Sequence, residues 1–172
     1  GGKITKSHMI LFDYSENAGV DKGHYFHQDL LVAKLIYENK PKRHVDIASR
    51  IDGFVAHVAS FREIEVFDVR TTRKSEHENI KFRKADLMHP QELGEIDSIS
   101  CLHAIEHFGL GRYTDRIDIN GHNKGITNLV SLISNGGRLY ISFPIGQQDE
   151  VHFNAHRVFN ANTIFEHPSI KE

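Results

Sequence analysis

Five short apolar segments, separated by helical or long polar connections, place the strongest constraint on how this chain folds. They lie at 44–49, 63–70, 80–87, 96–103 and 138–144, and most are rich in the branched and aromatic residues typical of β-strands. Nearly continuous apolar strands that alternate with such connections favour a parallel sheet covered on both faces. We therefore predict an α/β fold of the Rossmann-like, doubly wound type, with a mostly parallel sheet.

Three segments between these strands carry apolar residues at helical spacing. The first, 25–39, ends before a proline, and the second begins at Asp52, which we expect to act as its N-cap. The third, 125–134, is closed by an Asn-Gly-Gly turn, and one more short helix is expected near the C-terminal end. On this pattern we expect an N-terminal arm and helix over 1–40 and a Rossmann-like domain over 41–172.

Composition narrows the class of protein. The 172 residues suit one domain with one core, and a formal net charge of −2 gives no basic surface for nucleic acid. The sequence has neither an apolar run of about 18 residues nor a signal-peptide pattern, so we expect no membrane partner. The single cysteine, Cys101, lies inside a predicted strand and suits a reducing cytoplasm. A homo-oligomer that covers an exposed sheet edge stays an open alternative.

Acids at the ends of predicted strands indicate a nucleoside ligand. Asp68 ends the second strand 22 residues beyond Asp46, close to the offset at which an acid accepts hydrogen bonds from a ribose. A pyrophosphate needs a glycine-rich first turn, but this turn is A-S-R-I-D-G, in which Asp52 would repel phosphate. S-adenosyl-L-methionine contains adenosine without phosphate, so it is the predicted cofactor. Asp86, at the end of the third strand, would then bind the adenine amino group.

Four segments resemble the DUF268 family of uncharacterised proteins, which is similar in its strand motifs to class I S-adenosylmethionine-dependent methyltransferases. They are HVDIASRIDGFVAHVASFREIEVFDVR, DSISCLHAIEHFGLGRY, GGRLYISFPIG and FNAHRVF, and the resemblance spans residues 20–165. The resemblance implies cofactor contacts at Asp46, Ala48, Ser49 and Gly53, a ribose contact at Asp68 and an adenine contact at Asp86.

The chain departs from the methyltransferase pattern in two places. Ala48, Arg50 and Asp52 stand where glycines are usual, and Arg50 could either obstruct the cofactor or pair with its carboxylate. The methyltransferase fold normally adds two more strands after the fifth, so we expect a sheet that lacks the last two. Either a removed end or a minimal fold would account for these missing strands, and the absence of an initial Met also suits a trimmed chain.

A cluster of titratable residues follows the fourth strand, where a methyl group would meet its acceptor. A nearby base can take the acceptor's proton, and we favour His107 for that role, with Glu106 orienting His107 or the substrate. His103 could act with them or shape the cofactor pocket. We expect these three residues to be the catalytic group.

Further candidates surround this cluster. Arg112, Tyr113, His156 and Arg157 are the candidate substrate-binding residues. Arg112 could pair with an anionic or sugar substrate, and with Tyr113 it opens a loop long enough to act as a lid. The residues expected to face the same cleft after the fifth strand are Asn154, His156 and Arg157, and those expected to fold over the cofactor are Tyr25, His27 and Gln28.

The leading hypothesis is a methyltransferase that acts on a small molecule, such as the hydroxyl of a saccharide or nucleotide-sugar, by in-line displacement. The first alternative is a non-catalytic Rossmann-like domain that has lost the cofactor. The second is a zinc hydrolase, because residues 103–107 spell H-x-x-E-H, a motif that requires a continuous helix and a third ligand. We predict no metal site.

Overall fold

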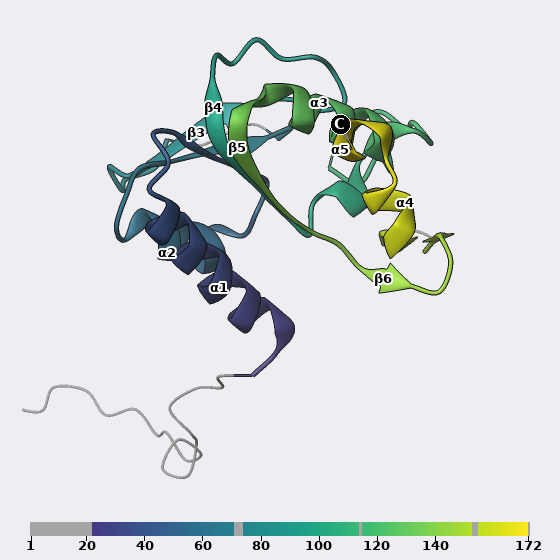
Figure 1. Cartoon of the computed structure of the whole chain (residues 1–172), viewed down its shortest axis with the longest axis horizontal. Helices are drawn as coiled ribbons and strands as arrows, with labels where there is room; N and C mark the ends of the chain where they lie inside the picture. Colours follow the sequence, from purple (N-terminus) through teal and green to yellow (C-terminus); the bar gives the residue numbers. More distant parts are fainter. Residues whose placement is uncertain (1–21, 71–73, 114, 153–154, 172) are drawn as a thin grey trace, which may run out of the picture.

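Five parallel strands form the central sheet in the order β3-β2-β1-β4-β5 (Figure 1). Their bounds are β1 His44–Ile47, β2 Ile64–Asp68, β3 Ile80–Lys84, β4 Ile96–Leu102 and β5 Ile133–Ser142. The computed structural model describes residues 22–70, 74–113, 115–152 and 155–171. The order reverses between β1 and β4, which confirms the predicted doubly wound sheet and places its switch point there.

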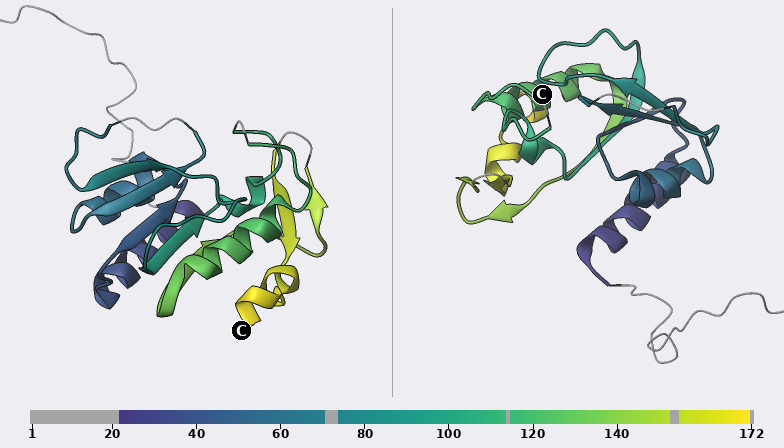
Figure 2. Two further views of the ribbon diagram at one scale, coloured as in Figure 1. Left: turned by 90° about the horizontal axis from the view of Figure 1, so that it is seen from above. Right: turned by 180° about the vertical axis from the view of Figure 1, so that it is seen from behind.

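Helices cover both faces of this sheet (Figure 2). One face carries α1 (His24–Asn39), the π-helical turn η2 (Ile51–Val55) and α2 (Ala56–Ala59). The other face is covered by α3 (Gly121–Leu132). The buried side chains accordingly form two clusters, one against α1 and α2 and the other against α3.

Helix α1 packs against the sheet and contributes side chains to the hydrophobic core. Its buried residues Val32, Ala33 and Ile36 lie at helical spacing and pack in one cluster with Phe54 of η2 and Val66 of β2. The domain boundary expected at residue 40 stays a prediction. No helix in the described part of the chain is both long and apolar enough to cross a membrane.

The helical segment after β1 starts differently from the expectation. Asp52 was predicted to cap it, but Arg50 occupies the N-cap position and Asp52 lies inside the first turn. The exposed Asp52 carboxylate instead pairs with Arg50, with Oδ2 3.0 Å from Nη2. The backbone kinks at Gly53, where φ is −124° and ψ is −112°. A local ion pair has therefore replaced the predicted cap.

A second, smaller sheet follows the central one and was not predicted. It has the order β6-β8-β7, with β6 Ile145–Gly146, β7 Glu150–Val151 and β8 Arg157–Asn160. β6 and β7 have two residues each, too few for a detectable periodicity, and β8 lies in the tail where only a helix was expected. The expected C-terminal helix is present as two short ones, α4 (Ala161–Phe165) and α5 (Pro168–Lys171). Beyond β5 the described residues add no strand to the central sheet.

Phe159 of β8 connects the small sheet to the main core. Its side chain is 1% exposed and meets the Phe143 ring edge-on at 5.6 Å between centroids. We expect Phe159→Ala to lower the free energy of unfolding by about 3–5 kcal/mol in urea denaturation, because it opens a cavity in the core. The control Phe165→Ala, at a position 60% exposed, should change it by less than about 0.5 kcal/mol. Equal effects would show that the small sheet packs independently.

Candidate cofactor and active site

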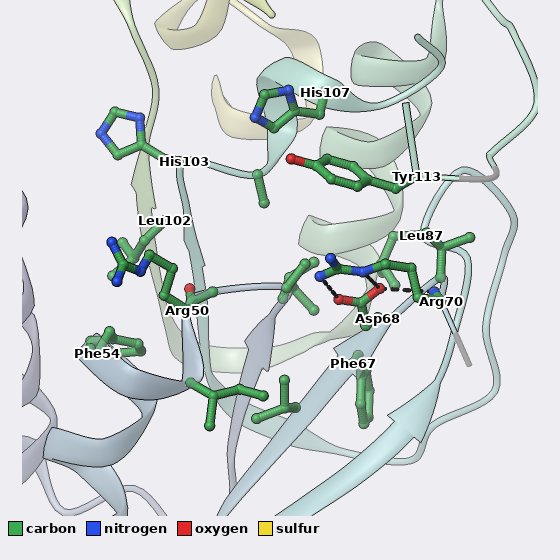
Figure 3. Close-up of a pocket in the computed structure, with 18 of the residues that line it drawn as sticks. Arg50, Phe54, Phe67, Asp68, Arg70, Leu87, Leu102, His103, His107 and Tyr113 are labelled. Atoms are coloured by element: carbon green, nitrogen blue, oxygen red, sulfur yellow. Dashed lines mark hydrogen bonds and ion pairs between the residues drawn. The ribbon is translucent and has the colours of Figure 1, made fainter. Parts of the chain in front are cut away.

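A cavity of about 1230 Å³ lies at the carboxyl ends of β1, β2, β3 and β4, next to the switch point (Figure 3). Residues 47–53, 68–70, 85–88 and 102–104, which end or follow these four strands, contribute its walls. This is the position at which open α/β sheets bind their ligands. The fold therefore gathers the ends of four strands, which are far apart in sequence, around one space.

The buried carboxylate of Asp46 holds the turn after β1 by accepting hydrogen bonds. The Ser49 backbone N–H and hydroxyl donate to the Asp46 carboxylate at 2.9 and 2.8 Å, and the Ser100 hydroxyl donates to it at 2.6 Å. Ala48 and Ser49 line the cavity, whereas Asp46 is fully buried beneath them. Asp46 thus shapes the turn that would bind the cofactor.

A buried histidine extends this network and was not found from the sequence. Because the Ser100 hydroxyl donates to Asp46, it accepts from His44 Nε2 at 3.2 Å, which leaves His44 Nδ1 to accept from the Ser98 hydroxyl at 2.8 Å. Burial lowers the pKa of His44 to about 3, so the ring is neutral. Burial also raises the pKa of Asp46 to about 6, even though its hydrogen bonds act in the opposite direction.

Asp68, the predicted ribose ligand, lines the cavity but is engaged by a neighbour. The Arg70 backbone N–H and Nε each donate to Asp68 Oδ1 at 2.8 Å, and Arg70 Nη2 donates to Oδ2 (Figure 3). Burial raises the pKa of Asp68, but the bonds from Arg70 outweigh it and the net pKa is lowered. The Arg70 guanidinium also lies 5.0 Å from the centroid of the Tyr113 ring. The pairing with Arg70 was not predicted. The signal that could have indicated it is an Asp and an Arg two residues apart at the end of a strand.

The other proposed cofactor contacts lie around the same cavity. Asp86 follows β3, lines the cavity and accepts a hydrogen bond from the Met88 N–H at 3.0 Å. Gly53 lines it too, and a Cβ there would lie 2.9 Å from Asp29 Oδ2 of α1. Arg50 also borders the cavity, with its guanidinium paired to Asp52 as described. Asp29 carried no sequence signal, because its approach to the turn depends on how α1 packs.

The three predicted catalytic residues lie together after β4, but their pairing differs from the expectation. His103 Nδ1 is 3.1 Å from Glu106 Oε1, so Glu106 orients His103 and not His107. His107, at the end of the 3₁₀ turn η3 (Ile105–His107), donates from Nδ1 to the Ala155 carbonyl at 3.0 Å, which leaves Nε2 as an acceptor. Burial lowers the pKa of His107, so its ring is neutral at pH 7.

A second cavity of about 650 Å³ adjoins the first. The two share the residues Tyr25, His103, His107 and Tyr113 in their walls. In Figure 3, Tyr113 lies between His107 and the Asp68–Arg70 pair. The candidate base therefore stands at the boundary of two spaces, as a transfer between two bound molecules requires.

The predicted substrate residues separate into two groups. Arg112 and His156 line the second cavity, and the His156 ring lies 6.3 Å from the His107 ring. Arg157 is 4% exposed and lines neither cavity. Its guanidinium donates to the carbonyl of Phe108 at 2.5 Å, so it ties β8 to the segment after η3.

Among the N-terminal candidates, Tyr25 and Gln28 line the first cavity and His27 does not. Asn154 lies outside the described residues, as does most of the expected N-terminal arm.

The geometry of the H-x-x-E-H segment does not match a zinc-peptidase helix. His103 lies at the end of β4 with a left-handed φ of 51°, and the helical turn covers only Ile105–His107. The described residues contain no group of three side chains placed to hold a metal ion. The two histidines therefore lack the continuous helix that the motif requires.

Residues 62–164 match the family model described as "Caenorhabditis protein of unknown function, DUF268". The chain belongs to the DUF268 family. This confirms the predicted resemblance. No curated protein matches the DUF268 chain.

Solved structures place the DUF268 chain in the class I methyltransferase fold. An S-adenosylmethionine-dependent methyltransferase from Clostridium acetobutylicum is 15% identical, with a TM-score of 0.53 over 76% of this chain and 58% of that one. The amino pentose methyltransferase CalS10 from Micromonospora echinaspora is 14% identical, with a TM-score of 0.54 over 70% and 51%. The 1,6-didemethyltoxoflavin-N1-methyltransferase from Burkholderia thailandensis is 12% identical, with a TM-score of 0.57 over 81% and 64%. The chain thus spans 51–64% of these proteins' length.

Ala48 has a left-handed φ of 57°, which strains an alanine but suits the glycine usual at this position. We expect Ala48→Gly to raise the free energy of unfolding by about 0.5–1 kcal/mol. The exposed Ala56 has a helical φ of −63°, so the control Ala56→Gly should lower it by about 1 kcal/mol. Urea denaturation measures both, and a loss of stability in both variants would contradict the strain.

The raised pKa of Asp46 predicts a pH-dependent stability. The native carboxyl has a pKa of about 6 and the unfolded one a pKa near 3.8. Between these two pH values the native carboxyl is protonated and the unfolded one is not. The resulting stabilisation is fully present below about pH 4 and is lost as the pH rises through 6. From pH 7 to pH 5 the wild type should therefore gain about 1 kcal/mol relative to Asp46→Asn in urea denaturation. A difference that is the same at both pH values would contradict the shifted pKa.

Proposed function

We propose that this DUF268 protein is an S-adenosyl-L-methionine-dependent methyltransferase that acts on a hydroxyl of a small molecule, a saccharide or nucleotide-sugar. The observation that carries the proposal is the meeting of two cavities at His103, His107 and Tyr113. One cavity lies at the switch point of the sheet, and the other opens beside the candidate base. This arrangement supports a cofactor and an acceptor that meet at one wall.

The residues around the first cavity fit this cofactor. In the proposed complex Asp68 accepts hydrogen bonds from the ribose hydroxyls and Asp86 from the adenine amino group, since Asp68 ends β2 and Asp86 follows β3 on the cavity wall. The left-handed turn at Ala48 brings the backbone of Ala48 and Ser49 to the same wall, with Gly53 beside it. When bound, the cofactor supplies a methyl group on a positively charged sulfur.

His107 then acts as the general base. Its Nδ1 is fixed by the Ala155 carbonyl, and its neutral ring leaves Nε2 to accept the proton of the acceptor hydroxyl. Glu106 holds the His103 ring through Oε1, which makes His103 a positioning residue at the shared wall. The aromatic and histidine side chains there keep the hydroxyl oriented for in-line attack, which is the main source of acceleration in such reactions.

A non-catalytic Rossmann-like domain is the second candidate. Arg70 occupies both oxygens of Asp68, and the first turn carries an alanine at a left-handed position where glycine is usual. A protein that no longer binds the cofactor would be free to keep both features. The two candidates differ in a single measurable property, cofactor affinity.

Isothermal titration of S-adenosylhomocysteine separates them. We expect micromolar binding by the wild type and at least a tenfold loss, about 1.4 kcal/mol, in Asp68→Ala, because two charge-assisted hydrogen bonds to the ribose disappear. The control Glu63→Ala removes an exposed acid just before β2, at the end of the strand opposite Asp68, and should bind as the wild type does. No heat with any of the three proteins would favour the non-catalytic domain.

A further inference from the structure

The lining of the second cavity combines apolar and polar side chains. Phe143, Pro144 and Ile145, which follow β5, are its apolar part. Arg112 and His156 are polar lining residues, and the shared residues described above connect the cavity to the first one. An apolar lining with a few polar groups is the usual composition of a small-molecule site.

The charge balance of this cavity is one-sided. Among the described residues, Glu106 is the one acid that lines it; the Glu106 side chain is 3% exposed and one of its oxygens is bonded to His103. The exposed lining group with a permanent charge is therefore the Arg112 guanidinium. The whole chain has a formal net charge of −2, so an exposed cation without an exposed acid in one cavity is a local feature. Such a cavity attracts anions.

Arg112 is fixed in place but not neutralised. Its Nη1 donates to the Ala155 carbonyl at 2.8 Å, and its guanidinium lies 5.3 Å from the Tyr113 ring centroid. Arg50 and Arg70 each pair with an acid, but no acidic side chain in the described ranges pairs with Arg112. One of its five N–H groups serves the carbonyl, which leaves a planar fork suited to a carboxylate or phosphate.

His156 adds a second donor at the same place. It directly follows Ala155, to which Arg112 is bonded, and its ring lies 5.3 Å from that of His152 and 6.3 Å from that of His107. Burial is the main cause that lowers the pKa of His107; Glu106 raises it, and Arg112 and His156 lower it. An anion bound beside Arg112 and His156 would offset the charge of the guanidinium.

We infer that the second cavity binds an anionic group of the acceptor, a phosphate or a carboxylate, through Arg112 and His156. The inference rests on the proposed function and names the charged part of its substrate. The anion would anchor the acceptor at Arg112 and His156 while the acceptor's hydroxyl faces His107 Nε2 at the boundary with the first cavity.

Nuclear magnetic resonance titrations of the full chain test this with defined probes at constant ionic strength: inorganic phosphate, acetate and neutral glucose. We expect the His156 ring signals to shift, and the shift to saturate, at millimolar concentrations of phosphate or acetate. Glucose should cause no shift. Tighter phosphate binding would assign a phosphorylated acceptor, and tighter acetate binding a carboxylated one. Shifts with glucose alone, or with no probe, would overturn the inference.

Matched variants locate the effect. Arg112→Gln should weaken anion binding by about tenfold or more, because it removes the charge-assisted hydrogen bonds. Arg116→Gln changes an exposed arginine of the same loop that lines neither cavity and should bind as the wild type does. Equal binding by wild type and Arg112→Gln would also overturn the inference.

Titration of S-adenosylhomocysteine on the same samples separates this inference from the proposed function. Cofactor binding without anion binding refutes the anion site alone. Anion binding without cofactor binding refutes the methyltransferase and leaves the anion site standing.

Discussion

The buried carboxyl of Asp46 is the constraint on which the rest of the site depends. It joins the turn after β1 to β4 through the hydroxyls of Ser49 and Ser100, across the point where the strand order reverses. The neutral ring of His44 continues this connection between β1 and β4, through Ser100 and Ser98. Because each oxygen of the carboxyl is engaged, the turn is held in a left-handed conformation at Ala48 that its own sequence does not favour.

A chain of contacts leads from this turn's cavity to the acceptor side. Arg70 holds Asp68 and lies over the Tyr113 ring, and Tyr113 meets the His107 ring edge-on at 5.4 Å. Arg112 lies against the same tyrosine and shares the Ala155 carbonyl with His107. The residues proposed to bind ribose, to accept a proton and to bind an anion are thus physically continuous. A cofactor bound at Asp68 would have to displace Arg70 from that carboxylate. Because Arg70 also lies over the Tyr113 ring, cofactor binding would change the contacts of Tyr113.

The strands were predictable because a half-buried or buried sheet demands branched and aromatic residues in runs of fixed length, as in 96–103. Acids at strand ends were equally predictable, since parallel strands bring these ends to one edge; Asp68 and Asp86 both line the cavity as expected. The pairing of side chains was not. Glu106 was expected to orient His107 or the substrate, yet its Oε1 lies 3.1 Å from His103 Nδ1.

The sequence by itself determined the sheet class, the family resemblance and the group of titratable residues after β4, because these depend on local composition and spacing. Tertiary structure alone decided which distant partner each side chain takes: Ser100 bonds to Asp46, His107 to the Ala155 carbonyl, and Arg157 to the Phe108 carbonyl. Those pairings arise when segments distant in sequence meet, and the free energy of burying a polar group selects the partner that satisfies it. No spacing along the chain encodes that choice.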